Sequence, residues 1–181
     1  MFKIVFLSFL IVLTSSSLSN FRKLKELILM SKTNSQYLKA TKNCHVGSPE
    51  IKKQAESWIK GAKTPREKAL RLYNFVRDKI EYEKYSNTRY GSLKTLKIKK
   101  GNCVDQHHLL NALLRTVGIP ARYKNGYVVF RSSGLVGHVW TYAFIDGKWR
   151  DLDTTHRSNS FDKIYNWTKA KSSEILTAVN F

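Results

Sequence analysis

One cysteine of this chain lies where a thiol could become reactive. In the stretch GNCVD, Asn102 is a suitable helix N-cap, which makes Cys103 the first residue of the following helix. There the thiol would face free backbone N–H groups and the positive end of the helix dipole, and both favour the nucleophilic thiolate. The same N–H groups could hold an oxyanion after attack on a carbonyl. A purely structural cysteine would be expected further along, among the leucines, so Cys103 is predicted to be a nucleophile.

A cysteine nucleophile needs a base, and the base needs a group that orients it. The candidate base is His138, in a predicted strand that leads into the hairpin turn Asp146-Gly147. A two-residue turn fixes the pairing of its strands and places Asp153 opposite Trp140. His138 and Asp153 are then diagonal neighbours on one face, about 7–8 Å apart between backbones and within side-chain reach. Asp151 lies one pair further away, so Asp153 is predicted to orient His138.

Spacing alone leaves other partners for Cys103 open. His107 follows it by one helical turn and could reach back, whereas His108 is expected in the core. All three could ligate zinc, although their spacing matches no usual zinc motif. Cys44, the other cysteine, could form a disulfide with Cys103 in an oxidising compartment, which would disable the nucleophile. We predict no metal ion and no cofactor, and dependence on a divalent cation stays open.

Three helices are expected to precede and position the sheet. Ser48-Pro49-Glu50 starts one helix, and Thr64-Pro65-Arg66-Glu67 starts a second through a capping box. The third helix runs from Cys103 to Gly118, and its leucines form a buried stripe. Pro120 prevents its continuation. Each helix therefore has a start signal, a periodic apolar face or a stop signal of its own.

After the third helix the hydrophobic period changes to two, which predicts strands. We expect strands over residues 121–130, 138–145 and 148–153, with a loop at 131–137. Residues 82–100 are expected to be a loop with short extended pieces. Helices followed by an antiparallel sheet predict an α+β fold.

Composition indicates one globular domain with a strong positive charge. The 181 residues are 42% hydrophobic and carry 32 Lys and Arg against 13 Asp and Glu, a formal net charge of +19. Such an excess favours a polyanionic partner, namely nucleic acid, an acidic membrane surface or an acidic polymer. The alternative is a solvated, lysine-rich surface with no particular partner.

The first thirty residues have the pattern of a leader. Lys3 precedes an apolar run, Ile4–Leu13, and a serine cluster, as in secretory signal peptides. The run is short for a membrane span, and no Ala-x-Ala cleavage site follows, so membrane anchoring and a buried amphipathic helix stay open. We therefore expect a signal peptide or anchoring leader at 1–30 and a catalytic domain at 31–181. The protein would be secreted or bound to the cell envelope, which argues against nucleic acid as its partner.

Several motifs resemble the transglutaminase-like cysteine hydrolase superfamily. They are the Gly-x-Cys start at Gly101, the helix end GIPARY, the GHVW that contains His138, and Asp153-x-Thr155. Within this superfamily the chain is most similar to pseudomurein endoisopeptidases, enzymes that cut peptide cross-links in the walls of certain methanogenic archaea. That similarity extends over YLKATKNCHV (37–46), NTRYGSLKTL (87–96), NCVDQHHLLNALLRTVGIPARY (102–123) and NSFDKIYNW (159–167).

The resemblance implies a papain-like or transglutaminase-like core with Cys103 as nucleophile, His138 as general base and acid, and Asp153 as the group that orients His138. It implies hydrolysis of the Ala–Lys isopeptide bonds of pseudomurein, through an acyl-enzyme, by a protein expected to be a monomer. Pseudomurein carries carboxylates and would attract a chain of charge +19.

Two other functions fit the same residues. One is a related enzyme of the superfamily, either a cross-linking acyl transferase or a general cysteine peptidase. The other is a non-catalytic, basic module that binds the cell wall, which predicts no thiol reactivity. The substrate-binding residues are not identified. Five aromatic residues could line a cleft or belong to the core, and they stay unassigned: Tyr82, Tyr85, Tyr90, Trp140 and Trp149.

Overall fold

The computed structural model describes residues 15–181, so the apolar run of the predicted leader lies outside the described residues. The chain forms two compact units, Met1–Asn34 and Ser35–Phe181. Helix α1 (Ser15–Ser35) begins in the first unit. Within residues 15–181, no helix combines the length and the apolar character that a bilayer crossing requires. Cleavage of a leader and the predicted boundary at residue 30 stay predictions.

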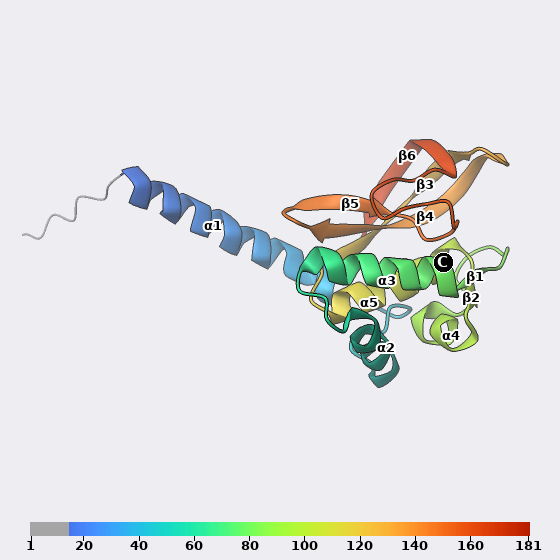
Figure 1. The fold of residues 1–181 in the computed structure, drawn as a ribbon. Helices are drawn as coiled ribbons and strands as arrows, with labels where there is room; N and C mark the ends of the chain where they lie inside the picture. Colours follow the sequence, from blue (N-terminus) through green and yellow to red (C-terminus); the bar gives the residue numbers. More distant parts are fainter. Residues whose placement is uncertain (1–14) are drawn as a thin grey trace, which may run out of the picture. The chain divides into compact units, whose positions relative to one another are not determined.

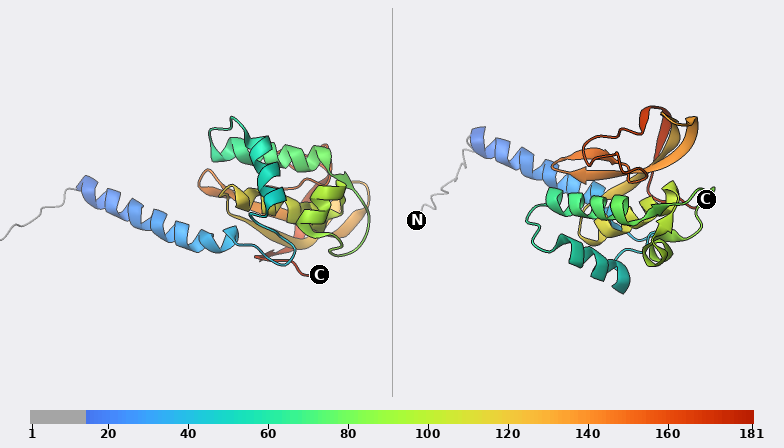
Figure 2. Two further views of the ribbon diagram at one scale, coloured as in Figure 1. Left: turned by 90° about the horizontal axis from the view of Figure 1, so that it is seen from below. Right: turned by 45° about the vertical axis from the view of Figure 1, so that its right-hand side comes forward.

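The second unit consists of helices on one side of a four-stranded antiparallel sheet (Figure 1, Figure 2). The strand order in this sheet is β5-β4-β3-β6, and β1 and β2 form a separate two-stranded parallel sheet. The predicted α+β fold is therefore confirmed. Its elements are η1 (Gln36–Leu38), α2 (Pro49–Ile59), α3 (Pro65–Lys79), β1 (Glu81–Tyr82), α4 (Gly91–Ile98), β2 (Lys100–Gly101), α5 (Cys103–Thr116), β3 (Ala121–Phe130), β4 (Gly134–Ile145), β5 (Lys148–Leu152) and β6 (Trp167–Leu176).

The predicted helix starts are confirmed in detail. The Ser48 hydroxyl caps α2 by accepting a hydrogen bond from the backbone N–H of Ile51. The Thr64 hydroxyl caps α3 by accepting from the N–H of Glu67 at 3.1 Å. The Glu67 carboxylate accepts in return from the N–H of Lys63 at 2.6 Å, one residue before the usual capping-box donor. These bonds satisfy N–H groups that a helix start leaves without partners.

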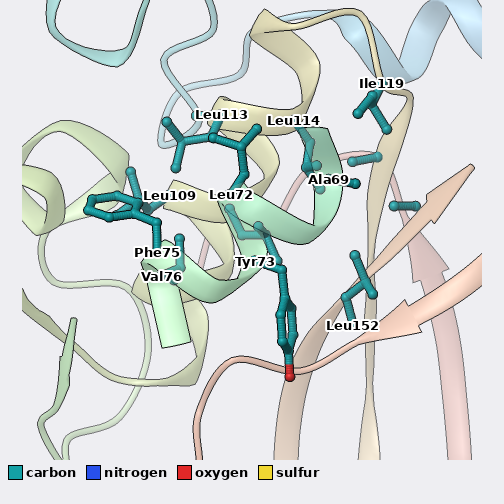
Figure 3. Close-up of a cluster of buried hydrophobic side chains, with 14 of the residues drawn as sticks. Ala69, Leu72, Tyr73, Phe75, Val76, Leu109, Leu113, Leu114, Ile119 and Leu152 are labelled. Carbon is teal, nitrogen blue, oxygen red and sulfur yellow. The ribbon is translucent and has the colours of Figure 1, made fainter. Parts of the chain in front are cut away.

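The main core lies between α3, α5 and the sheet (Figure 3). Leu72 and Val76 of α3 pack against the leucines of α5, and both are fully buried. Twelve of the fourteen residues of α5 are buried, because helices cover it on one side and the sheet on the other. A helix enclosed in this way is held rigidly.

Three elements differ from the sequence predictions. Helix α4 occupies part of the predicted loop 82–100, and β4 begins four residues before the predicted strand. Strand β6 was not predicted. Most of the described residues of β6 are polar and exposed, which is usual at a sheet edge and leaves no clear alternation.

Strand β6 approaches β3 closely at Gly126. A Cβ added to Gly126 would lie 2.0 Å from the carbonyl oxygen of Ser172, so only glycine fits at this point. Gly126 is also the partner of His138 across the β3–β4 ladder. Strand β6 starts at Trp167, which pairs with Phe130 of β3 and whose ring centroid lies 6.2 Å from that of His138.

Candidate active site

The start of α5 holds Cys103 in the predicted position. The Asn102 carboxamide oxygen accepts a hydrogen bond from the N–H of Asp105 at 2.9 Å, which is the geometry of an N-cap. The Asn102 amide group donates to the carbonyl of Asn87 at 2.7 Å. Cys103 is half-buried as the first helical residue. Its thiol therefore lies beside the free backbone N–H groups at the start of α5. The Asn102 side chain fixes this start by bonding to Asp105 within the helix and to Asn87 in the preceding loop.

Asp105 ties a preceding loop to this helix start. Its fully buried carboxylate accepts hydrogen bonds from the Tyr85 hydroxyl at 2.5 Å and from the backbone N–H of Gly91 at 2.7 Å. The N–H groups of Arg89 and Tyr90 donate to the same carboxylate at 3.1 Å. No local sequence pattern predicts these contacts of Asp105, because its donors come from residues 14–20 positions earlier.

His138 and Asp153 meet as the hairpin register predicts. Ile145 pairs with Lys148, and the β4–β5 ladder ends with Leu152, so Asp153 follows the last paired residue. The Nε2 atom of His138 lies 2.9 Å from Oδ2 of Asp153, and both side chains are buried. Asp151 instead accepts from the indole N–H of Trp140 and pairs with Lys124. The contact of His138 with Asp153 rather than Asp151 is confirmed.

Further donors hold the Asp153 carboxylate in place. The indole N–H of Trp167 donates to Oδ2 at 2.5 Å, and the N–H and hydroxyl of Thr155 donate to Oδ1 at 2.9 and 2.7 Å. The Tyr73 hydroxyl donates to the backbone carbonyl of Asp153 at 2.9 Å. Thr155 belongs to the Asp-x-Thr motif, whereas no local pattern marks Tyr73 or Trp167 as neighbours of this site.

The charges of this pair stabilise each other. Burial disfavours the imidazolium, but the Asp153 carboxylate and the Cys103 thiol outweigh burial and raise the pKa of His138 to about 10. Burial also opposes ionisation of Asp153, yet His138 and His107 hold its pKa well below the usual range. Cys103 also contributes to the raised pKa of His138, which puts the thiol among the neighbours of the imidazole. Such a pair can activate a sulfur nucleophile and return a proton to a leaving group.

A second imidazole faces Asp153 from α5. His107 is fully buried, its Nδ1 lies 3.0 Å from the Thr141 hydroxyl, and its Nε2 lies 3.6 Å from Oδ1 of Asp153. Burial dominates there and lowers the pKa of His107. The sequence assigned no partner to His107 other than Cys103. His108 is a core residue as predicted: its ring contacts the hydroxyls of Tyr123 and Thr88, and burial lowers its pKa to about 4.

The two cysteines are free, so the disulfide alternative is wrong. Cys44 is fully buried, and burial raises the pKa of its thiol, which makes it a poor nucleophile. Within residues 15–181, no three His, Cys, Asp or Glu side chains are grouped so as to hold a metal ion. In particular, His108 points to Tyr123 rather than toward Cys103.

A cavity of about 480 Å³ opens beside His138. Of the five unassigned aromatic residues, Tyr82 lines this cavity, and the ring of Trp140 stacks on His138 with centroids 5.9 Å apart. The Tyr85 hydroxyl and the Tyr90 backbone N–H instead donate hydrogen bonds to the Asp105 carboxylate. Trp149 packs against the Arg122 guanidinium, which lies 3.8 Å from its ring centroid.

Comparisons with known proteins agree with this geometry. Residues 52–154 match the model of the transglutaminase-like superfamily, and this segment contains Cys103, His138 and Asp153. Over 93 residues the chain is 31% identical to an uncharacterized protein of Mycobacterium leprae (strain TN), ML0607. That match covers 47% of this chain and 33% of the relative, so the chain spans about a third of the relative's length.

Two solved structures share the fold. A provisionally assigned cysteine protease from Cytophaga hutchinsonii superposes with a TM-score of 0.58 at 21% identity, over 80% of this chain and 56% of that chain. The periplasmic domain of TgpA from Pseudomonas aeruginosa superposes with a TM-score of 0.55 at 19% identity, over 70% and 48% of the two chains. At these identities the likeness establishes the fold alone.

Proposed function

The chain belongs to the transglutaminase-like superfamily, and from that premise we propose that Cys103, His138 and Asp153 form a catalytic triad that breaks amide bonds. One observation carries the proposal. Nε2 of the His138 imidazole lies 2.9 Å from the buried Asp153 carboxylate, and Cys103, at a helix start, contributes to the raised pKa of the same imidazole. Each group has the neighbour that its role requires.

The proposed reaction has two halves. The Cys103 thiolate attacks the carbonyl carbon, and backbone N–H groups at the start of α5 stabilise the oxyanion. The carbon–nitrogen bond then breaks, the imidazolium of His138 gives its proton to the leaving amine, and a thioester remains on sulfur. In the second half, His138 takes a proton from water, whose oxygen attacks the thioester. The acid product leaves, Cys103 is regenerated, and Asp153 keeps the imidazole oriented throughout.

For the substrate, we propose the Ala–Lys isopeptide cross-links of pseudomurein. The stretches around Cys44, around Tyr90 and over residues 159–167 support this choice, because they resemble the endoisopeptidases outside the triad motifs. The net charge of +19 suits a wall polymer that carries carboxylates. The protein would act as a monomer outside the cytoplasmic membrane, secreted or anchored through its leader, with the wall rather than nucleic acid as its partner and without a cofactor.

The test is digestion of purified pseudomurein with the wild type, Cys103→Ala and Cys44→Ala. We expect the wild type to release new alanine carboxyl ends and lysine ε-amines, identified by mass spectrometry. Cys103→Ala should release none. Cys44→Ala is the matched control, since it removes the other thiol and should cut the polymer per folded molecule.

The outcome separates three functions. New covalent cross-links in place of new ends would identify an acyl transferase instead of a hydrolase. Undiminished digestion by Cys103→Ala would contradict the proposed nucleophile. Binding to the wall without any covalent change would identify a non-catalytic module.

A further inference from the structure

We propose that the cavity beside His138 is the subsite for the amine component of the substrate, and that it selects an aliphatic amine carrying a carboxylate. This inference rests on the proposed function and adds a specificity to it. The cavity is defined by its lining side chains, of which the following carry the argument: Tyr82, Lys84, Phe130, Arg131, Val136, His138 and Tyr165.

The position of the cavity assigns it to the amine side of the scissile bond. His138 lines the cavity, whereas Cys103 does not. In amide cleavage the acyl carbon bonds to sulfur while the nitrogen receives the imidazolium proton. The leaving amine must therefore lie over His138. A cavity that borders His138 but not Cys103 is placed to hold the group that this nitrogen carries.

The walls of this cavity suit an aliphatic chain. Tyr82, Val136 and Tyr165 line it, and they are 47%, 39% and 43% exposed, unusually high values for large apolar side chains. Phe130 adds a further ring and packs edge-on against His138, with centroids 5.0 Å apart. Exposed apolar side chains that gather around one concave surface indicate a ligand-binding site. The methylene chain of a lysine would bury part of this surface.

The charge of the cavity suits a carboxylate. Lys84 and Arg131 both line it, and no Asp or Glu among the described residues does. Lys84 follows β1 and Arg131 follows β3, so two distant segments bring their cations to one place. Neither residue forms an ion pair in the part of the chain that the structure describes.

Arg131 is also positioned in advance. Its Nε donates to the carbonyl of Tyr165 at 2.8 Å, and its backbone N–H donates to the carbonyl of Asn166 at 3.1 Å. The terminal nitrogens of the guanidinium have no protein partner among the described residues, so they can donate to a carboxylate as a fork. An apolar cavity with a fixed guanidinium and a lysine fits a lysine side chain whose own α-carboxyl is free, or is followed by an acidic residue.

The test uses one pair of probes, Nα-acetyl-Nε-alanyl-lysine with a free α-carboxylate and the same compound with an α-carboxamide. Binding is measured by NMR titration of Cys103→Ala, which cannot turn the probes over. We expect the carboxylate to bind about fivefold more tightly, as for a partly exposed ion pair. In the triple variant that also carries Lys84→Gln and Arg131→Gln the two affinities should become equal. Arg131→Lys keeps the charge but loses the fork, so it should retain only part of the preference.

The matched control is Lys53→Gln with Lys148→Gln, two exposed lysines outside the cavity that remove the same charge. In the Cys103→Ala background this control should keep the fivefold preference. Equal affinities for the two probes, no binding of either, or a preference that survives the loss of Lys84 and Arg131 would overturn the subsite.

Cleavage of the same probes by protein with an intact Cys103 separates this inference from the proposed function. A carboxylate preference in kcat/KM that disappears with Lys84→Gln and Arg131→Gln supports both. Selective binding without cleavage of either probe would support the subsite and contradict isopeptide hydrolysis. Cleavage of both probes with equal kcat/KM and equal affinity would overturn the subsite and leave the hydrolase in place.

Discussion

Two fully buried carboxylates, Asp105 and Asp153, lie near Cys103 and have different partners. Asp105 accepts hydrogen bonds from a tyrosine hydroxyl and from backbone N–H groups of one loop. Asp153 accepts from His138 and Trp167 and faces His107 at 3.6 Å. A backbone N–H keeps its proton, whereas an imidazole can take up a proton and release it. The first centre therefore holds structure in place, and the second can take part in chemistry.

The comparison shows that burial of an aspartate does not define its role. Both side chains need several donors, because an ionised carboxylate without partners is costly to bury. At Asp153 the negative charge also raises the pKa of a neighbouring base, His138, against the effect of its burial. Substitutions that disrupt one carboxylate at a time therefore separate the two roles.

Asp153→Asn should have the largest effect. The amide keeps the shape of the side chain but removes the negative charge that orients His138 and raises its pKa. The value of kcat/KM should therefore fall about 10³–10⁴-fold. Steady-state cleavage of an isopeptide substrate measures this loss. Asp151→Asn, in the strand two residues earlier, is the matched control and should stay within about threefold of the wild type. A similar loss in both variants would remove the distinction between the two residues.

The pH dependence should change with the same substitution. The pKa of His138 is raised to about 10, so the imidazolium that protonates the leaving amine persists until the pH passes that value. We expect kcat/KM of the wild type to fall above about pH 10, and the residual activity of Asp153→Asn to fall at a clearly lower pH. If kcat/KM fell at the same alkaline pH in both proteins, Asp153 would not be the group that keeps His138 protonated.

The stability of the protein should also depend on pH through His138 and Asp153. The pKa of His138 in the folded protein lies above its ordinary value near 6.5. Its contribution to the free energy of unfolding is therefore complete below pH 6.5 and is lost as the pH rises through about 10. The pKa of Asp153 is lowered from 3.8, so its contribution is present above that value and is lost as the pH falls through the depressed pKa. Urea unfolding from pH 7 to 10.5 should show the first loss in the wild type and a much smaller one in His138→Gln.

Asp105→Asn should act mainly on stability. It leaves several donors of the loop 85–91 facing a neutral amide, and we expect the free energy of unfolding to fall by about 2–4 kcal/mol. Activity per folded molecule should fall less than about tenfold, because no proton of the reaction passes through Asp105. Urea unfolding and active-site titration measure the two quantities. A loss of activity as large as in Asp153→Asn, with unchanged stability, would contradict the structural role.

His107→Gln should have the smallest effect on the chemistry. Burial lowers the pKa of His107, so this imidazole is neutral. Its Nε2 lies 3.6 Å from Oδ1 of Asp153. We expect kcat to fall by about three- to tenfold, through looser positioning of the carboxylate, while the alkaline limb of the pH profile stays in place. A shifted limb would indicate that His107 shares the proton of His138.

The parts of the site that follow from local rules could be predicted. The N-cap at Asn102 fixed the position of Cys103, and the Asp146-Gly147 turn fixed the register that joins His138 to Asp153. Both rules act over a few residues or through a tight turn. The fold class followed from the order of helices and strands, and the structure confirms it.

The parts that depend on distant packing could not be predicted. Trp167 reaches Asp153 because β6 adds to the edge of β3 and starts opposite Phe130. Helix α4 is short and mostly polar at its exposed positions, and a hydrogen bond from Ser92 to the carbonyl of Asn43 anchors it to the rest of the fold. The second imidazole on Asp153, from His107, requires the packing of α5 on β4. Periodicity and caps say nothing about contacts of this range.

The most direct test of the triad is the mass of the protein during turnover. Wild type is mixed with an Ala–Lys isopeptide substrate, quenched in acid within the first turnovers and mapped by peptide mass spectrometry. We predict a thioester-linked acyl group on the peptide that contains Cys103, none on the peptide that contains Cys44, and no adduct or cleavage with Cys103→Ala. Cleavage by Cys103→Ala at the wild-type rate, with no acyl group on the wild-type protein, would contradict the nucleophile and with it the triad.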